Sequence, residues 1–447
     1  MKNGNIMKHK RNKAIFLPLL AALCAMLCGC SIQVESLLSP PKLSEEQAAI
    51  YEALQAGRGR EIHLKYPRSG KYRSAFVIEN IDEEETEEAI VFYEASNITD
   101  GGSSLRLNFL DREDGKWVSV YDYAALGSEI ERVQFADLGD GETSIIITYT
   151  IQNASDSAVS VLKYADKTPS EVYTGRCAYT SILDIDGDGH SELFQISRDL
   201  DSGTATASLL GQSADGGFQI LSSAQLSGFT ECRGVTLGVC DEEGHRAIFI
   251  DRSLGDGSIG TDVLICYDDL RLSAVTTVPE VLSRRTNTYT PNILSRDIDG
   301  DGIIETASTA AFPGYENLPR AEQVNSIAWY QIESGGDAIK RDALSYLSIR
   351  SDYLLFIPTR WEGRVTVTIS VSEGTVTFSE YDSGTRVTGA ELLTIMAVKP
   401  GGASAPAGYT PYGKNEGTGY RFYIRNNKGN SLALTEAELA DCFKILE

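Results

Sequence analysis

Two nine-residue segments of the chain carry acidic residues at a spacing that suits a calcium ion. Each has aspartates at its first, third and fifth positions, glycines at its fourth and sixth, and a glutamate at its ninth. Calcium takes about six to eight oxygen ligands, and a tight loop can aim alternate carboxylates and one backbone carbonyl at a single point. The sequence therefore predicts two structural calcium sites. The expected ligands are Asp184, Asp186, Asp188, Glu192 and the carbonyl of His190 in the first loop, and Asp297, Asp299, Asp301, Glu305 and the carbonyl of Ile303 in the second.

Two alternatives to a calcium loop between strands fit these segments less well. The first alternative is a pair of acidic turns that bind no ion and only keep the edge of a sheet hydrated. It fits less well because clustered carboxylates repel one another strongly unless a cation lies between them. An EF-hand is the other; it needs a glutamate at position 12 and flanking helices, whereas runs rich in β-forming residues follow both loops. Calcium binding in a loop between strands is the favoured interpretation.

Three further segments follow the same pattern less completely. The segment that begins at Asn80 keeps oxygen-bearing side chains at positions 1, 3, 5 and 9 but lacks both glycines, so we interpret it as a weaker metal site. The segments from Ala136 and Val239 keep fewer acids and are predicted to be structural turns. The weaker site would use Asn80, Asp82, Glu84 and Glu88. The sixth positions of the five copies recur every 48–58 residues, at Glu85, Gly141, Gly189, Gly244 and Gly302.

The stretches between these loops are typical of β-strands. Runs such as 145–149 and 263–267 are rich in β-branched and aromatic residues and end at Gly, Asp or Asn turns. Four strands in each repeat is the pattern of a propeller blade. The sequence therefore predicts a mainly β fold, a β-propeller of about six four-stranded blades, or seven, over residues 60–385.

The two ends of the chain have a different pattern. Residues 43–59 predict a short helix that starts at Ser44, with acids in its first turn. A sixth, weaker repeat is expected to start near Trp361. Residues 386–447 either complete the last blade or form a small α/β cap.

The repeats resemble the FG-GAP/VCBS repeats of integrin-α-type β-propellers, whose blades carry D-x-D-G-D-G-x-x-D loops between strands. The resemblance covers residues 75–320 in spacing, and the motif is intact only in the two loops at Asp184 and Asp297. Position 9 is Glu in place of Asp in both, and the aromatic-Gly and Gly-Ala-Pro flanks of the family are missing. The resemblance implies a calcium-binding propeller.

The first thirty residues resemble the leader of a bacterial lipoprotein. A basic stretch is followed by an uncharged apolar run at 14–27, which is too short to span a bilayer comfortably. The run ends in Leu27-Cys28-Gly29-Cys30, which is similar to a lipobox. This implies a signal peptide at 1–29, lipidation (palmitate) of Cys30, a tether at 30–42 and a place on the outer side of the cell membrane. An ordinary signal peptide or an uncleaved anchor is the alternative.

Charge and cysteine content exclude some functions. The chain has 63 acidic and 40 basic residues and a net charge of −23, so it repels nucleic acid and concentrates cations. Beyond the leader an odd number of cysteines remains, and their spacing fits no zinc motif and assigns no disulfide pairs. These residues are Cys177, Cys232, Cys240, Cys266 and Cys442.

No segment of the chain carries a recognised catalytic motif. A G-x-S-x-G elbow, an H-E-x-x-H zinc motif and a phosphate-binding P-loop are all absent from the sequence. We therefore favour a binding or scaffolding module that is anchored at the membrane, binds calcium and takes a protein or glycan partner. A surface hydrolase or lyase acting on polysaccharide is the alternative, since propellers also host such sites and a fold alone does not decide function.

Overall fold

The computed structural model describes residues 43–58, 62–95, 104–199, 201–213, 216–254, 258–275, 293–336, 338–403 and 405–446. Cys30, the leader and the tether lie outside the described residues. In the described part of the chain, no helix is long and apolar enough to cross a membrane. The chain divides into two compact units, residues 1–59 and residues 60–447.

The described part of the first unit is a single helix, α3 (Glu45–Arg58). Its start is fixed by a reciprocal cap: the amide of Gln47 donates to Ser44 Oγ, and the amide of Ser44 donates to Gln47 Oε1, each over 3.1 Å. Glu45 and Glu46 lie in the first turn, where negative charge is favourable to the helix dipole. The capping side chain is therefore Ser44, with Gln47 completing the cap.

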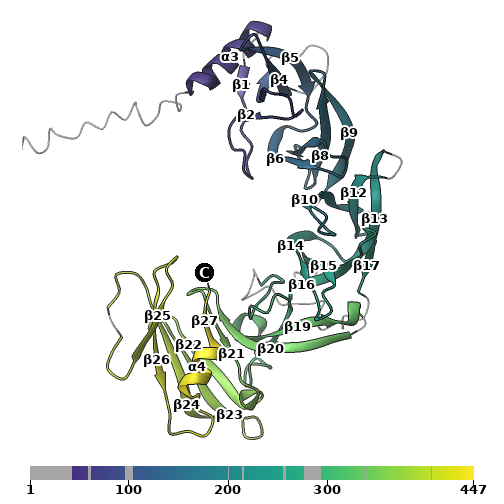
Figure 1. The fold of residues 1–447 in the computed structure, drawn as a ribbon. Coiled ribbons are helices and arrows are strands. Elements are labelled where there is room, and N and C mark those ends of the chain that lie inside the picture. Colours follow the sequence, from purple (N-terminus) through teal and green to yellow (C-terminus); the bar gives the residue numbers. More distant parts are fainter. Residues whose placement is uncertain are drawn as a thin grey trace, which may run out of the picture. The chain divides into compact units, whose positions relative to one another are not determined.

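In the second unit, the described strands form six antiparallel sheets (Figure 1). Sheet 1 contains β1 (Ile62–Leu64), β2 (Phe76–Glu79), β3 (Glu88–Ala95), β4 (Leu105–Glu113) and β5 (Lys116–Ala124). Sheet 2 contains β6 (Glu129–Asp137), β7 (Thr143–Thr150), β8 (Ser157–Ala165) and β9 (Thr168–Cys177). Sheet 3 contains β10 (Tyr179–Leu183), β11 (Glu192–Asp199), β12 (Thr204–Gln212) and β13 (Phe218–Ser227).

The later sheets recruit strands from the C-terminal part of the chain. Sheet 4 contains β14 (Glu231–Val239), β15 (Arg246–Ser253), β16 (Ile259–Cys266) and β17 (Leu272–Ala274). Sheet 5 contains β18 (Thr306–Ala311), β19 (Asn325–Glu333), β20 (Ala338–Ser348), β21 (Tyr353–Phe356) and β27 (Phe443–Ile445). Sheet 6 contains β22 (Val365–Ser370), β23 (Thr375–Asp382), β24 (Val387–Val398), β25 (Thr410–Lys414) and β26 (Arg421–Asn426). Short helices are η1 (Arg320–Glu322), η2 (Ser334–Gly336), η3 (Thr359–Trp361) and α4 (Glu436–Cys442).

The middle strands of these sheets are buried on both faces. In β7, six consecutive residues are buried, and β3 and β15 show similar unbroken runs. A strand that is covered on one face only would alternate buried and exposed side chains. The continuous apolar runs in the sequence therefore reflect sheets that pack against a neighbour on each face.

Buried clusters join each sheet to the next one along the chain. Phe109 of sheet 1 stacks on Tyr164 of sheet 2, with 5.4 Å between ring centroids, inside a cluster drawn from both sheets. Similar clusters link sheets 2 and 3, 3 and 4, 4 and 5, and 5 and 6. The hydrophobic core is thus a series of inter-sheet layers.

The strand count differs from the expected four per sheet. Sheets 2, 3 and 4 have four strands, but sheets 1, 5 and 6 have five. In sheet 1 both β1 and β2 pair with β3. In sheet 5 the extra strand is β27, which comes from the end of the chain and pairs with β21; the aromatic ring of Phe443 stacks on Tyr353 at 5.2 Å.

All five cysteines of the described part are free thiols, and three of them are buried. Burial raises the pKa of four of these thiols to about 12. Because the thiolate is the reactive form, these side chains act as small apolar core residues. The four are Cys177, Cys232, Cys240 and Cys266.

Candidate metal sites in the acidic loops

The five acidic segments occupy equivalent places in five successive sheets. The segments at 136–142, 184–192 and 239–245 each join the first strand of a sheet to its second strand, and the segment at 80–88 joins β2 to β3 in sheet 1. In sheet 5 the first strand is reduced to a single antiparallel bridge between Arg296 and Glu305, and the loop lies within that bridge. The recurrence of 48–58 residues in the sequence is therefore the length of one sheet and its connection.

The loop at 184–192 is closed by its own aspartates. Asp184 Oδ1 accepts a hydrogen bond from the amide of Gly187 over 2.7 Å. Asp186 Oδ1 accepts from the amide of Asp188 over 3.2 Å, and Asp188 Oδ1 accepts from the amide of His190 over 2.8 Å. Each carboxylate thus accepts a backbone hydrogen bond with one of its oxygens, which fixes its orientation.

The loop at 297–305 makes the same three bonds at the same three positions. Asp297 Oδ1 accepts from the amide of Gly300 over 2.6 Å. Asp299 Oδ1 accepts from Asp301 over 3.1 Å, and Asp301 Oδ1 accepts from Ile303 over 2.7 Å. Two segments more than a hundred residues apart in the chain therefore build one common geometry from the same residue types.

Glycine is required at positions 4 and 6 because the backbone is left-handed there. Gly187 and Gly189 have φ of 83° and 93°, and Gly300 and Gly302 have 92° and 89°. Residues with a Cβ adopt this region only at a cost. The loop at 80–88 has Glu83 at position 4 with φ of 63°, so the left-handed conformation forms at that position without a glycine.

Three carboxylates converge in each of the two intact loops. One oxygen from each of Asp184, Asp186 and Asp188 lies within 4.8 Å of the others in the first loop. The corresponding set in the second loop is Asp297, Asp299 and Glu305. Such a set can supply three anionic oxygens to one cation, which suits calcium, a hard ion that prefers carboxylate ligands.

The glutamate at position 9 has a structural role in both loops that the sequence pattern does not reveal. Its Oε2 accepts the amide N–H of position 2 in each loop. The bonds are 3.0 Å from Ile185 to Glu192 and 2.9 Å from Ile298 to Glu305. Glu305 Oε1 and Asp301 Oδ2 also accept from Gln331, each over 2.9 Å.

The loop at 80–88 keeps the closing glutamate but gathers no trio of carboxylates among the described residues. Glu88 Oε2 accepts from the amide of Ile81 over 2.7 Å. Asn80 uses its amide nitrogen to donate to the carbonyl of Glu84 over 2.7 Å, and Asp82 Oδ1 accepts from the amide of Glu84 over 3.3 Å. The interpretation of this loop as a weaker metal site stays a prediction.

In the loop at 136–142 the protein supplies its own positive charge. Asp137 Oδ1 accepts three backbone amides, and its Oδ2 lies 2.6 Å from His190 Nδ1 of the next loop. The hydrogen bond from His190 lowers the pKa of Asp137, and Asp137 raises that of His190. The ammonium of Lys163 lies 2.6 Å from Asp140 Oδ1. This loop therefore has its negative charge balanced without a metal.

The loop at 239–245 contains a third group of ligand atoms that the sequence pattern did not predict. One atom from each of Asp241, Glu243 and His245 lies within 4.8 Å of the other two. Asp241 is buried and accepts from the amides of Glu243, His245 and Gly335 and from His245 Nδ1. In the sequence, the feature that could have indicated this group is the histidine at position 7 of the segment, His245. His245 Nδ1 lies 2.7 Å from Asp241 Oδ2, so the loop supplies a hydrogen-bond partner to its own buried carboxylate.

The acidic loops lie where successive sheets meet. Each loop of sheets 2, 3 and 4 receives at least one hydrogen bond from the sheet that follows. These bonds run from His190 to Asp137, from an Arg246 guanidinium nitrogen to the carbonyl of Asp184 over 2.9 Å, and from the amide of Gly335 to Asp241. A cation in such a loop would thus stabilise the contact between two sheets as well as the loop.

A pH dependence follows from the buried glutamates. Burial raises the pKa of Glu88, Glu192 and Glu305 from 4.5 to about 7. Between these values the folded protein binds more protons than the unfolded chain, so its stability falls as pH rises through this window. In chelator, the melting temperature should be higher at about pH 5.5 than at about pH 8. Saturating calcium should flatten this trend, because an ion replaces the proton. A rise in stability over the same pH interval in chelator would contradict the assignment.

No protein-family profile matches the chain, and no curated protein matches it in sequence. Among solved structures, similar folds include a rhamnogalacturonan lyase, with 12% identity, a TM-score of 0.31 and coverage of 84% of this chain and 64% of that one. A periplasmic gluconolactonase of Pseudomonas aeruginosa has 11% identity, a TM-score of 0.28 and coverage of 73% and 86%. An exo-β-1,3-galactanase of Phanerochaete chrysosporium has 8% identity, a TM-score of 0.27 and coverage of 83% and 92%. Likeness at this level assigns neither a family nor an activity.

Proposed function

We propose that this chain is a calcium-stabilised β-propeller, anchored by lipid on the outer side of the cell membrane, that acts as a binding or scaffolding module for a protein or glycan. One observation carries the proposal. Two loops in different sheets make the same three hydrogen bonds at the same positions, and each brings three carboxylates together, from positions 1, 3 and 5 in the first loop and from positions 1, 3 and 9 in the second.

Calcium is the ion that this arrangement favours. Asp184, Asp186 and Asp188 offer only oxygen ligands, and the equivalent set at 297–305 does so too. Oxygen ligands suit hard cations, whereas zinc is usually held by nitrogen and sulfur. An ion that binds only the folded state stabilises it in proportion to the logarithm of its concentration. The proposed place outside the cytoplasmic membrane would expose the sites to calcium of the medium.

The proposal of a propeller is supported by the order of the sheets along the chain and by their packing. Five sheets carry the acidic loop at the same connection, and the sheets pack face to face in chain order. This is the organisation expected of FG-GAP/VCBS-type blades, with the five-stranded sheets as a departure. Among its described residues the sixth sheet has no acidic loop of this type.

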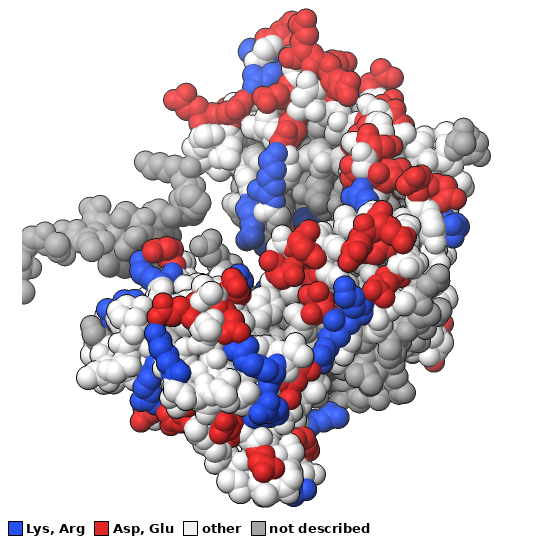
Figure 2. Space-filling view, turned by 60° about the horizontal axis from the view of Figure 1, so that its bottom comes forward, with Lys and Arg blue, Asp and Glu red and all other residues white. Residues whose placement is uncertain are grey.

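Surface charge supports a partner other than nucleic acid. Figure 2 shows acidic side chains spread over much of the visible surface, with basic ones most frequent in the lower half of the view. Such a surface repels polyanions. We place binding above catalysis because the three groups of converging acidic and histidine side chains found among the described residues all lie in the acidic loops.

The anchor can be tested on Cys30 directly. In a bacterial host grown with labelled palmitate, the wild-type chain should incorporate label and partition into the detergent phase. The Cys30→Ala variant should lose both properties, because no other residue then provides the thiol in the lipobox context. Labelled and detergent-phase Cys30→Ala protein would refute the anchor without affecting the calcium proposal.

A further inference from the structure

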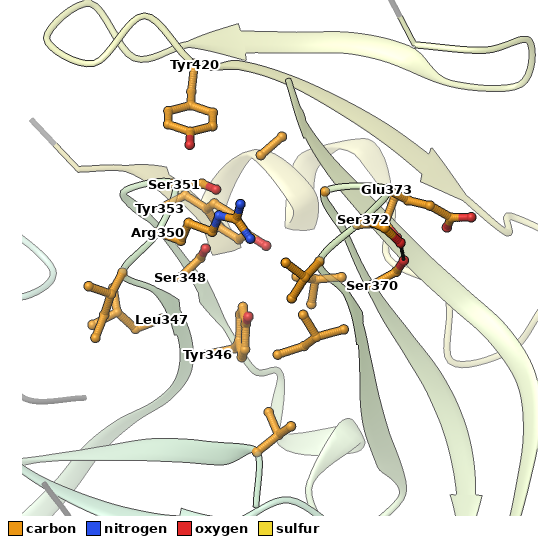
Figure 3. A pocket seen from close by; sticks show the side chains of 18 of the residues that line it. Tyr346, Leu347, Ser348, Arg350, Ser351, Tyr353, Ser370, Ser372, Glu373 and Tyr420 are labelled. Atoms are coloured by element: carbon orange, nitrogen blue, oxygen red, sulfur yellow. Dashed lines mark hydrogen bonds between the residues drawn. The ribbon is translucent and has the colours of Figure 1, made fainter. Parts of the chain in front are cut away.

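A cleft of about 820 Å³ lies between sheets 5 and 6, away from the acidic loops (Figure 3). One wall is the connection from β20 to β21, with Tyr346, Arg350 and Tyr353. The opposite wall is the hairpin between β22 and β23, with Ser370 and Ser372, and Tyr420 lies at the end of the cleft. Binding sites for small organic molecules have volumes of roughly 300–1,000 Å³, so the cleft has the size of such a site.

The walls of the cleft are held by a common core. Tyr346 of sheet 5 packs edge-on against Phe378 of sheet 6, with 5.6 Å between ring centroids. Both belong to a buried cluster that draws residues from both sheets and from the C-terminal segment. The cleft is therefore preformed.

The mouth of the cleft is apolar to a degree that is unusual in this acidic chain. Ile349, Ile369 and Val371 line it and are all exposed, Val371 by 64%. They come from both walls of the cleft. Exposed aliphatic side chains that gather at a concave site mark a place where an apolar group binds.

The cleft is also lined by two cationic side chains. Arg350 and Lys399 line it, and within the described residues neither forms an ion pair or a side-chain hydrogen bond. Tyr353 is 1% exposed and its hydroxyl lies next to Ser348, so this hydroxyl is out of reach of a ligand in the cleft.

Two acidic side chains, Glu322 and Glu373, also line the cleft. Figure 3 shows Arg350 reaching into the cleft from the wall of sheet 5, whereas Glu373 points away from it. Of these two labelled side chains, the one that faces the cleft is therefore the cation Arg350, in a chain whose net charge is −23.

We propose that this cleft binds a small amphipathic anion, a molecule with an apolar body and a single carboxylate or sulfonate. The apolar body would lie against Ile349, Ile369 and Val371. The acidic group would pair with Arg350 and Lys399. This site is independent of the proposed calcium loops, so either can fail without the other.

The test uses two fluorescent probes on the full chain. 8-Anilino-1-naphthalenesulfonate has an apolar body and a sulfonate, and N-phenyl-1-naphthylamine has a similar body without charge. The wild type should bind both. Arg350→Gln and Lys399→Gln should each raise the dissociation constant of the sulfonate probe about tenfold and leave that of the neutral probe unchanged. Val371→Asp should weaken both, since it places charge at the apolar mouth.

The matched control is Arg386→Gln, which removes an exposed arginine from the turn between β23 and β24, outside the cleft lining. It should leave both dissociation constants unchanged. The proposal is overturned if the wild type binds no sulfonate probe, if Arg350→Gln and Lys399→Gln both bind it as the wild type does, or if Arg386→Gln weakens it equally. Far-ultraviolet circular dichroism of each variant verifies folding, and Val371→Asp, at an exposed site, remains informative if either cation variant fails to fold.

Discussion

Alanine at both Asp186 and Asp299 is expected to abolish the rise in melting temperature that calcium produces in the wild-type chain. Each residue is the middle carboxylate of its loop and also accepts the amide of position 5. Removing it takes away one anionic ligand and releases the loop. An ion at about one hundred times its dissociation constant stabilises the folded state by roughly 2.7 kcal/mol per site, so two sites give about 5 kcal/mol. The difference between melts in calcium and in chelator measures this.

The quantity to compare between variants is the rise in melting temperature caused by calcium (the calcium-dependent increment), because the substitutions also lower the stability of the ion-free protein. Asp140→Ala is the matched control. Asp140 lies in an equivalent loop but is already paired with Lys163 at 2.6 Å, so its loss should reduce stability in both conditions and leave the increment intact. A double variant that keeps the whole increment would show that calcium binds elsewhere.

Trp361→Ala is expected to lower the free energy of unfolding by about 3–5 kcal/mol, the usual cost of truncating a fully buried aromatic side chain. Trp361 is buried, packs against Phe378 at 5.7 Å, and donates from Nε1 to the carbonyl of Leu432 over 2.7 Å. It thereby ties the start of sheet 6 to the C-terminal segment. The midpoint of urea unfolding, followed by far-ultraviolet circular dichroism, measures the loss.

Trp361→Phe separates the two parts of this effect. It keeps an aromatic ring in the core but leaves the Leu432 carbonyl without its donor, so it should cost less, about 1–3 kcal/mol. If Trp361→Ala unfolds within about 1 kcal/mol of the wild type, the packing described for this part of the core is wrong.

The repeated part of the fold was predictable because two signals coincide. Acidic loops recur at one spacing, and the runs between them, such as β7, are apolar without interruption. Both features are local, so the sequence displays them. They predicted a mainly β chain and the position of each loop relative to its strands, and the structure places all five loops at equivalent connections.

Features that depend on distant pairing could not be predicted. Nothing in the residues 443–445 indicates that they pair with β21, which lies far back along the chain. The ion pair between Lys163 and Asp140 depends on how neighbouring strands pair, and it offsets negative charge in the loop at 136–142. The cleft is similar: Arg350 and Val371 belong to ordinary turns, and only the packing of sheets 5 and 6 brings them to one site.

The most direct test of the central claim is the number of calcium ions bound per chain, measured by equilibrium dialysis on the wild type and on variants. We expect two ions for the wild type, one for Asp186→Ala or Asp299→Ala, and none for the double variant. A wild-type chain that binds no calcium, or a double variant that still binds two ions, would contradict the account.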